Sequence, residues 1–165
     1  YEIRLSLVGS EMCIRDRDYF DAYAKEIRDI IRKDQPGIIH AASNYQNALP
    51  ALQLGKRLDI KTIYEVRGMW HHTQSSKIIG FQNSDRFNLQ EQQEFHCCHI
   101  ADEVFCISES LKGYLMDHGI DGSKITVVPN GVDTASIAPI EKDDEIIRKY
   151  NLNRHHVLGL SLIHI

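Results

Sequence analysis

Short apolar segments alternate with longer amphipathic segments along most of the sequence, and this alternation limits the fold more than any other feature. Between Asp18 and Lys33 apolar side chains recur at helical spacing, and the pair Pro36-Gly37 ends the pattern. The next segment, IIHAA, has the length and composition of a buried strand. Strands separated by helices of about 10–15 residues are typical of parallel sheets with right-handed crossovers. The sequence therefore predicts an α/β fold with a doubly wound parallel sheet.

Breakers and capping residues set the boundaries of these elements. A helix is expected to start at the cap Ser108 and to stop at Gly119. Pro50 is tolerable only near the first turn of its helix. Residues 67–83, rich in Gly, His, Ser and Gln, are expected to form a loop. The other expected strands and helices are residues 38–42, 61–66, 104–107 and 124–128, and residues 18–33, 43–58 and 84–101.

The two ends of the chain look foreign to the rest. A DNA sequence can be written that encodes the last six residues, LSLIHI. The reverse complement of that DNA lies unbroken inside a DNA sequence that encodes residues 11–17. Both ends therefore resemble the translated adapter of a sequencing library, although natural terminal strands are the alternative. We expect residues 1–17 and 160–165 to be non-native segments and both natural termini to be missing. Residues 18–138 then form a partial N-terminal domain, and residues 139–159 form a linker and the start of a second domain, with a strand at 155–159.

Charge and composition argue against several classes of protein. The net charge of -4 argues against a nucleic-acid-binding protein, which usually carries a basic excess. No uninterrupted apolar run approaches the roughly 18 residues that a membrane-spanning helix needs. The four cysteines are not spaced as a disulfide framework, which favours a reduced compartment. We therefore expect a cytoplasmic globular protein with no nucleic-acid partner.

In doubly wound sheets ligands bind at the carboxyl ends of the strands, so the loops at those ends are the candidate site. None of these loops contains the glycine-rich dinucleotide fingerprint or a phosphate-binding GxxxxGK[ST] loop. Their sequences thus weigh against a nicotinamide-dependent enzyme and against a P-loop ATPase. The loops are residues 40–45, 65–73, 108–110 and 129–133.

The run His96-Cys97-Cys98-His99 has the residue types of a zinc site but not the spacing. Consecutive positions of a helix point about 100° apart, so these four side chains cannot surround one ion. We therefore expect no metal site. Cys98 and Cys106 are expected to be small buried hydrophobic residues.

Three segments carry a resemblance to a known family. GIIHAASNYQNALPALQLGKRL fits a strand–helix unit, TIYEVRGMWHHT fits a strand and its loop, and ADEVFCISESLKGYLMDHGIDGSKITVVPNGVD fits the end of a domain. In this order and spacing they resemble the N-terminal, acceptor-side domain of glycosyltransferase family 4, which is of GT-B type. The resemblance implies one of two facing Rossmann-like domains, the other of which holds the nucleotide sugar.

The same resemblance implies a function. It suggests a retaining glycosyltransferase of bacterial surface polysaccharide or glycolipid synthesis, with a nucleotide-diphosphate sugar as donor and no other cofactor. The acceptor would be a saccharide or a lipid-linked saccharide, which allows peripheral association with the inner face of the membrane. Because the donor domain is absent, this fragment alone should be inactive. A non-transferring relative, such as a nucleotide-sugar epimerase, or a binding-only domain is the alternative.

The resemblance assigns substrate-binding residues but no catalytic residue. Arg67 lies where many members place a histidine near the transfer centre, and it can clamp an anionic group or form a salt bridge with Glu65. Trp70, His71 and His72 form either an acceptor-facing wall or a packed tryptophan beside solvated imidazoles. The candidate binding residues are Asn44, Glu65, Arg67, Gly68, Trp70, His71, Ser108, Asn130 and Gly131.

Two of these candidates have a structural explanation as well. Ser108 is best explained as a helix cap, and its place at the end of a strand would also let it line the cleft. Asn130-Gly131 permits positive φ, so we expect a sharp turn that faces the donor. The alternative for this pair is a tight turn without any ligand contact.

Overall fold

A computed structural model describes residues 10–137 and 141–153 of the chain. The chain divides into two units between Asn130 and Gly131. The first unit contains the sheet, and the described part of the second contains one short helix, α6 (Asp144–Lys149), capped by Asp143. The expected strand at residues 155–159 and the ends of the chain at 1–9 and 160–165 lie outside the described residues. Within the described ranges no helix is long and apolar enough to cross a membrane.

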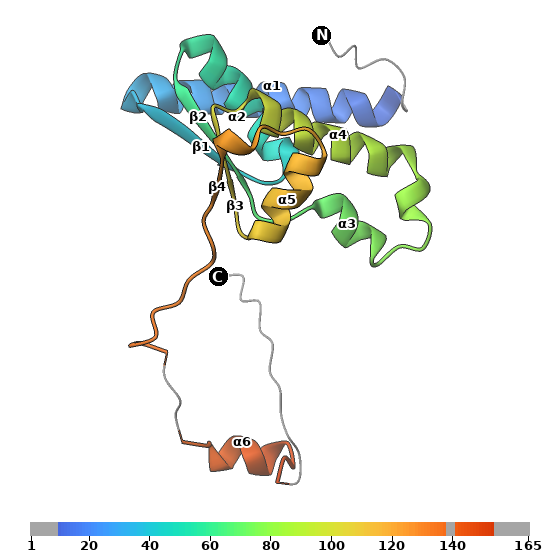
Figure 1. Cartoon of the computed structure of the whole chain (residues 1–165), viewed down its shortest axis with the longest axis vertical. Helices are drawn as coiled ribbons and strands as arrows, with labels where there is room; N and C mark the ends of the chain where they lie inside the picture. Colours follow the sequence, from blue (N-terminus) through green and yellow to red (C-terminus); the bar gives the residue numbers. More distant parts are fainter. Residues whose placement is uncertain (1–9, 138–140, 154–165) are drawn as a thin grey trace. The chain divides into compact units, whose positions relative to one another are not determined.

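Four parallel strands form the sheet, in the spatial order β1-β2-β3-β4 (Figure 1). Each strand pairs with its neighbour in sequence, so that Ala42 lies opposite Glu65 and Val66 lies opposite Cys106. The predicted α/β, Rossmann-like parallel sheet is confirmed. The strands are β1 (Ile38–Ala42), β2 (Lys61–Val66), β3 (Glu103–Cys106) and β4 (Ile125–Val127).

The expected helices of the first unit are present, and this unit contains one further α-helix. The segment expected to be a loop contains α3 (Trp70–Ser75) and a 3-10 turn at Phe81–Asn83. The first helix begins at Ser10 rather than at Asp18, so it includes residues 10–17. That these residues are a non-native segment stays a prediction. The long helices are α1 (Ser10–Asp34), α2 (Tyr45–Leu58), α4 (Asp85–Ile100) and α5 (Glu109–Asp117).

Side-chain oxygens cap the two helices that follow serine. The hydroxyl of Ser84 accepts a hydrogen bond from the Phe87 N–H at the start of α4, and that of Ser108 accepts one from the Leu111 N–H at the start of α5. The predicted cap at Ser108 is therefore confirmed. Pro50 lies beyond the first turn of α2, where it is buried. A proline there removes one backbone hydrogen bond, which the packing of α2 outweighs.

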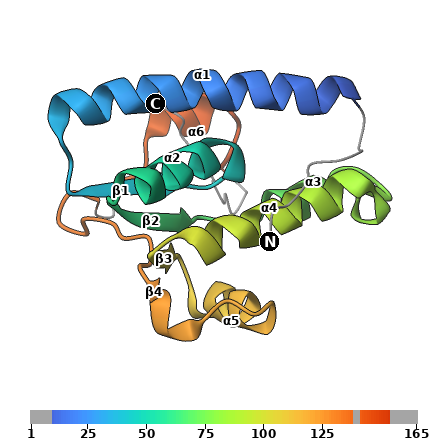
Figure 2. The same ribbon diagram turned by 90° about the horizontal axis from the view of Figure 1, so that it is seen from above.

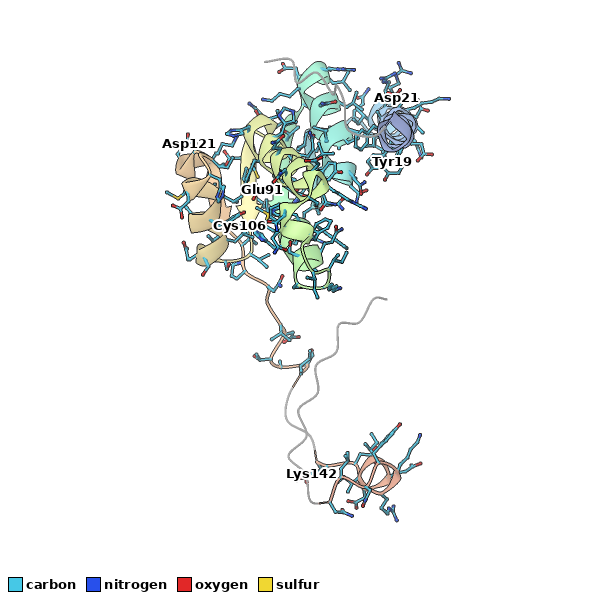
Figure 3. The ribbon with its side chains drawn as sticks, turned by 90° about the vertical axis from the view of Figure 1, so that its right-hand side faces the viewer. Tyr19, Asp21, Glu91, Cys106, Asp121 and Lys142 are labelled. Atoms are coloured by element: carbon cyan, nitrogen blue, oxygen red, sulfur yellow. The ribbon has the colours of Figure 1, made fainter. Side chains whose placement is uncertain are left out.

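One face of the sheet is buried beneath the helices. Right-handed crossovers between strands that follow one another in space place the connecting helices on the same face. The α2 helix packs on β1 and β2, α5 packs on β3 and β4, and α1 packs on the outer side of α2 (Figure 2). Side chains fill the layer between the sheet and the helices, where Cys106 is labelled (Figure 3). The fully buried residues of this face include Thr62, Tyr64, Val66, Val104 and Cys106.

A buried carboxyl group joins three elements at the centre of this layer. Glu94 of α4 accepts hydrogen bonds from the Tyr64 hydroxyl and, at 3.0 Å, from the Tyr45 N–H. Its side chain is almost completely buried. Burial raises the pKa of Glu94, and the hydrogen bonds from Tyr64 and Tyr45 partly oppose this rise. The contact fixes α4 against β2 and against the start of α2, where the pocket described below is found.

A second carboxylate fixes the amino end of β2. Asp102 accepts hydrogen bonds from the Thr62 N–H at 2.8 Å and from the Thr62 hydroxyl at 2.9 Å, and Lys56 of α2 lies 3.3 Å away. Burial would raise the pKa of Asp102, but the bonds from Thr62 and Lys56 outweigh it and lower the pKa to about 2. The carboxylate therefore stabilises the fold in its ionised form.

Candidate functional site

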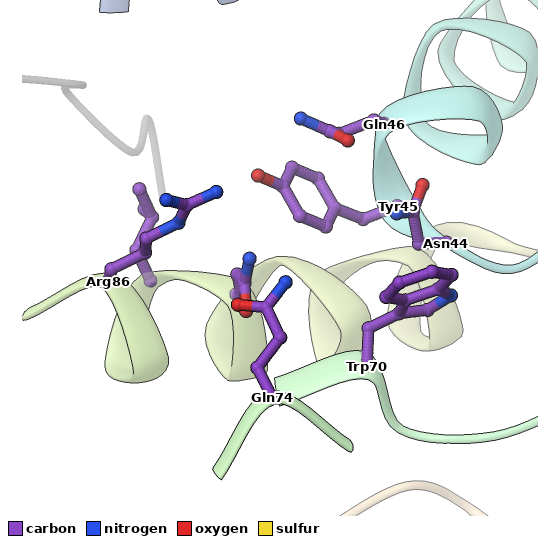
Figure 4. Close-up of a pocket in the computed structure, with 8 residues that line it drawn as sticks. Asn44, Tyr45, Gln46, Trp70, Gln74 and Arg86 are labelled. Carbon is purple, nitrogen blue, oxygen red and sulfur yellow. The ribbon is translucent and has the colours of Figure 1, made fainter. Parts of the chain in front are cut away.

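A pocket of about 280 Å³ opens where β1 and β2 end (Figure 4). Its floor and walls come from the start of α2, from α3 and from the first half of α4, so it lies where ligands of parallel sheets bind. Asn44 and Trp70, both expected from the sequence, line it. The full lining is Asn44, Tyr45, Gln46, Trp70, Gln74, Arg86, Leu89 and Gln90.

The lining combines amides, aromatic rings and one cation. Asn44, Gln46, Gln74 and Gln90 each offer hydrogen-bond donors and an acceptor. The side-chain oxygen of Gln90 is buried and has no hydrogen-bond partner within the protein. Such an atom loses its water without compensation unless a ligand donates to it. The pocket is therefore suited to a ligand with several hydroxyl or amide groups.

Trp70 and Arg86 supply the other two kinds of contact. Half of the Trp70 surface is exposed, so the ring presents an apolar face to the pocket. Figure 4 shows Arg86 on the side of the pocket away from Trp70, with the Tyr45 ring pointing toward its guanidinium. A guanidinium can bind a carboxylate or a phosphate through two parallel hydrogen bonds. The pocket can thus hold a ligand with an apolar face at one end and a negative charge at the other.

The Arg67 guanidinium forms an ion pair with Glu65. Its Nε and Nη2 atoms donate to the two carboxylate oxygens at 2.9 and 3.1 Å, and His40 Nε2 lies 3.0 Å from the same carboxylate. The hydrogen bond from Arg67, helped by His40, holds the pKa of Glu65 below its usual value despite some burial. The ion pair that was one interpretation of Arg67 is therefore present, and a role of either residue in substrate binding stays a prediction. Neither lines the pocket.

Two neighbours on α3 have different surroundings. Trp70 is half exposed and lines the pocket, and the acceptor-facing role that the sequence allows for it stays a prediction. His71 is completely buried instead of being solvated or part of an exposed wall, while His72 is exposed. The Phe87 ring packs edge-on against His71 at 4.9 Å between centroids. Gly68 precedes them in a loop with open space around its Cα.

The remaining candidates do not line the pocket. Ser108 acts as the cap of α5 and does not contribute to the pocket lining. Asn130 and Gly131 are exposed at the division between the two units, and neither residue has a positive φ. The sharp turn expected there is therefore wrong, because Asn-Gly permits that conformation but nothing around these residues requires it.

A cluster of polar side chains that the sequence did not indicate joins α3, α4 and α5. His71 Nε2 lies 3.7 Å from Glu91 Oε1, which accepts a hydrogen bond from the Tyr114 hydroxyl at 3.2 Å. The same hydroxyl lies 3.0 Å from His72 Nε2. Burial, followed by the nearby His72, lowers the pKa of His71 to about 4 although Glu91 opposes this. His71 is therefore a neutral imidazole at pH 7.

Cys97, Cys98 and Cys106 belong neither to the pocket lining nor to the cluster of His71, His72, Glu91 and Tyr114. Cys98 and Cys106 are buried, as predicted, and Cys97 is buried beside them. Burial raises the pKa of Cys98 to about 12, with Glu94 adding to the rise. These thiols are therefore protonated at neutral pH and act as apolar packing groups.

Comparison with solved structures gives the fold. The chain is similar to S. aureus MnaA in complex with UDP, with a TM-score of 0.55, 12% identity, and coverage of 82% of this chain and 35% of that protein. A putative UDP-N-acetylglucosamine 2-epimerase from Listeria monocytogenes gives a TM-score of 0.50, 14% identity and coverage of 67% and 26%. The UDP-GlcNAc 2-epimerase from Methanocaldococcus jannaschii gives a TM-score of 0.49 and 22% identity, with coverage of 66% of this chain and 27% of that protein. The chain thus spans about a quarter to a third of these structures.

Comparison with family models gives the family. No curated protein sequence matches the chain. The model for Glycosyltransferase Family 4 matches residues 10–136, which include the whole sheet and the pocket. The parallel sheet with a pocket at the carboxyl ends of β1 and β2 agrees with this match. The chain therefore belongs to glycosyltransferase family 4.

Proposed function

We propose that this chain supplies the acceptor-binding domain of a retaining glycosyltransferase that uses a nucleotide-diphosphate sugar. The complete protein would transfer a sugar to a saccharide or lipid-linked saccharide in bacterial surface polysaccharide or glycolipid synthesis. It would act in the cytoplasm at the inner face of the membrane. The fragment alone would bind acceptor without turning over, since the donor site would lie in the second domain.

The observation that carries this proposal is the pocket at the ends of β1 and β2. A saccharide offers hydroxyl groups to amides and an apolar ring face to an aromatic side chain. Trp70 provides such an aromatic face, and Gln90 provides a buried oxygen with no partner in the protein. Arg86 supplies the charge that an acidic sugar or a phosphate-linked acceptor requires.

A nucleotide-sugar epimerase is the second candidate. Its support is that two of the structures similar to this chain are named as UDP-N-acetylglucosamine 2-epimerases and a third contains UDP. At 12–22% identity these similarities concern the fold, which both activities share. In an epimerase the pocket of this domain would not bind a separate saccharide.

Saturation-transfer NMR with this chain distinguishes the two. The probes are chitobiose, cellobiose and an acidic hyaluronan disaccharide. We expect saturation of at least one disaccharide, and its loss in Trp70→Ala and in Gln90→Leu. The control is Ile79→Ala, because Ile79 is fully exposed and lies outside the pocket lining. Equal signals in the pocket variants and the control would contradict an acceptor pocket.

The complete protein allows a direct test of the reaction. Incubation with UDP-GlcNAc and no acceptor, followed by proton NMR, would reveal the 2-epimer if the protein is an epimerase. With an acceptor that binds the pocket, a transferase should form a glycosidic bond with the anomeric configuration of the donor. Appearance of the 2-epimer without transfer would replace the first proposal by the second.

A further inference from the structure

The cluster of His71, His72 and Glu91 contains the ligand types of a transition-metal site. Two imidazoles and one carboxylate favour zinc-like divalent ions over calcium or magnesium, which prefer oxygen ligands. One ligand atom from each residue can be chosen so that all lie within 4.8 Å of one another. We propose that these three side chains bind one zinc-like divalent ion between α3 and α4.

One pair of ligand atoms is already near the spacing that such an ion requires. Two atoms that bind one tetrahedral ion at about 2.0–2.1 Å lie about 3.3–3.4 Å apart. His71 Nε2 and Glu91 Oε1 are already 3.7 Å apart. His72 is exposed, so rotation about its side-chain bonds can bring its ring nitrogen closer. Three protein ligands leave one position for water, as in sites that are open to solvent.

The buried state of His71 is an independent sign of a ligand. Its side chain is completely buried, and neither ring nitrogen has a hydrogen-bond partner within the protein. Buried polar atoms are nearly always paired, because an unpaired one loses its hydration without compensation. Bonding of a ring nitrogen to a metal ion would supply the missing interaction. The exposed His72 ring provides the route by which the ion enters.

Tyr114 supports the site from α5. Its hydroxyl donates to Glu91 Oε1 and lies 3.0 Å from His72 Nε2, so it contacts two of the three ligands. Hydrogen bonds to ligating carboxylates orient them and usually affect metal affinity by about 10–100-fold. With the ion bound, the Tyr114 hydroxyl would keep its bond to Glu91 and give up its contact with His72.

The ion would fix α3 against α4 and take no part in sugar transfer. The α3 helix has only six residues and carries Trp70 and Gln74 of the pocket. Short helices gain little stability from their own hydrogen bonds and depend on tertiary contacts. Binding of metal should therefore stabilise the pocket wall, whether the pocket serves a transferase or an epimerase.

Titration of the chelator-treated chain with Zn²⁺ and Cu²⁺ tests the proposal. Calorimetry should show one Zn²⁺ bound per chain. Trp70 is the only tryptophan and precedes His71 directly, so binding of Cu²⁺ should quench its fluorescence. In His72→Ala and in Glu91→Gln the affinity for Zn²⁺ should fall at least about 100-fold, and in Tyr114→Phe about 10–100-fold.

His99→Ala is the matched control, because His99 is exposed on α4 and lies outside the cluster. Its affinity for Zn²⁺ and its quenching should equal those of the unchanged chain. Circular dichroism checks that each variant is folded, and both His72 and Glu91 are accessible enough to be replaced without disturbing the core. No bound Zn²⁺, or equal affinity in the cluster variants and in His99→Ala, would overturn the proposal. A thiolate-to-cobalt charge-transfer band with Co²⁺ would do so too, since it would place the ion at the cysteines.

Discussion

Glu94 and His71 are two buried titratable side chains at α4 that differ in their hydrogen bonding. Glu94 accepts hydrogen bonds from Tyr64 and Tyr45, and its partners come from β2 and α2. His71 is equally buried, yet neither of its ring nitrogens has a hydrogen-bond partner within the protein, and its nearest carboxylate oxygen, on Glu91, is 3.7 Å away. A satisfied buried group holds elements together, whereas an unsatisfied one costs stability. Glu94 therefore belongs to the structural framework, meaning the contacts that hold the strands and helices together. His71 instead indicates a place where a ligand could bind.

Removal of Glu94 should have the largest effect. In Glu94→Ala the Tyr64 hydroxyl and the Tyr45 N–H lose their acceptor inside the core, and a cavity remains. We expect a loss of about 3–4 kcal/mol in the free energy of unfolding, measured by urea denaturation at pH 7. Gln92→Ala on the exposed face of α4 is the control and should change it by less than about 0.5 kcal/mol. Similar values for both variants would remove the distinction between the two buried groups.

Replacement of His71 should change the free energy of unfolding in the opposite direction, or leave it unchanged. In metal-free protein, His71→Leu removes an unsatisfied polar group, so stability at pH 7 should be unchanged or higher by about 1 kcal/mol. A loss above about 2 kcal/mol at pH 7 would mean that the ring has a structural partner.

The pH dependence of His71 gives a sharper test. Its pKa of about 4 lies below the unfolded value of about 6.5, so the unfolded state binds the proton first as pH falls. The unchanged chain should therefore lose up to about 3 kcal/mol between pH 6.5 and pH 4, and His71→Leu should lack this loss. The facing groups His72, Glu91 and His118 remain in both proteins, so the difference isolates His71. Parallel stability curves for the two proteins would contradict the assignment.

Asp102 should show an intermediate effect at lower pH. Its pKa of about 2 lies below the unfolded value of about 3.9, so its contribution is complete above pH 4 and is lost as pH falls toward 2. The shift corresponds to roughly 2 kcal/mol, and Asp102→Asn should lower stability at pH 7 by about that amount. Thermal unfolding at pH 7 and pH 2.5 should show a difference between the two proteins that shrinks in acid. A constant difference would mean that Asp102 acts through packing alone.

The pair of Arg67 and Glu65 should show the smallest effect on stability. Arg67 is mostly exposed, and such ion pairs contribute at most about 1 kcal/mol because water and salt screen them. Arg67→Lys should therefore leave the melting temperature nearly unchanged. If Arg67 also clamps an anionic substrate, the same change in the complete enzyme should lower kcat/KM at least about tenfold. A large loss of stability instead would make it a structural residue like Glu94.

The strands and long helices were more predictable from the sequence than the residues that line the pocket. Strands and capped helices depend on local patterns, so β2 and the cap at Ser108 could be predicted. The α3 helix was missed because its buried residue is a histidine, which counts as polar in any periodic pattern. Gln90 was missed for the same reason, although the weak apolar stripe of α4 was a signal that polar residues are buried there.

Contacts between distant residues could not be predicted at all. Tyr64 and Glu94 are separated by 30 positions, and no local pattern relates them. In the sequence, the ligand types of a zinc site stand side by side at His96–His99, which are neighbours along the chain. The cluster described above instead combines His71 with Glu91 from a different helix. Only the fold brings these residues together.

The order of the strands has a consequence for how the protein is made. Within the described sheet β2, β3 and β4 each pair with the strand that precedes them along the chain. Every new pairing therefore closes a loop no longer than one crossover, and no strand waits for a partner that is synthesised much later. Chains with such local pairings pay less loop-closure entropy before they gain contacts. The sheet can thus grow strand by strand as the polypeptide leaves the ribosome.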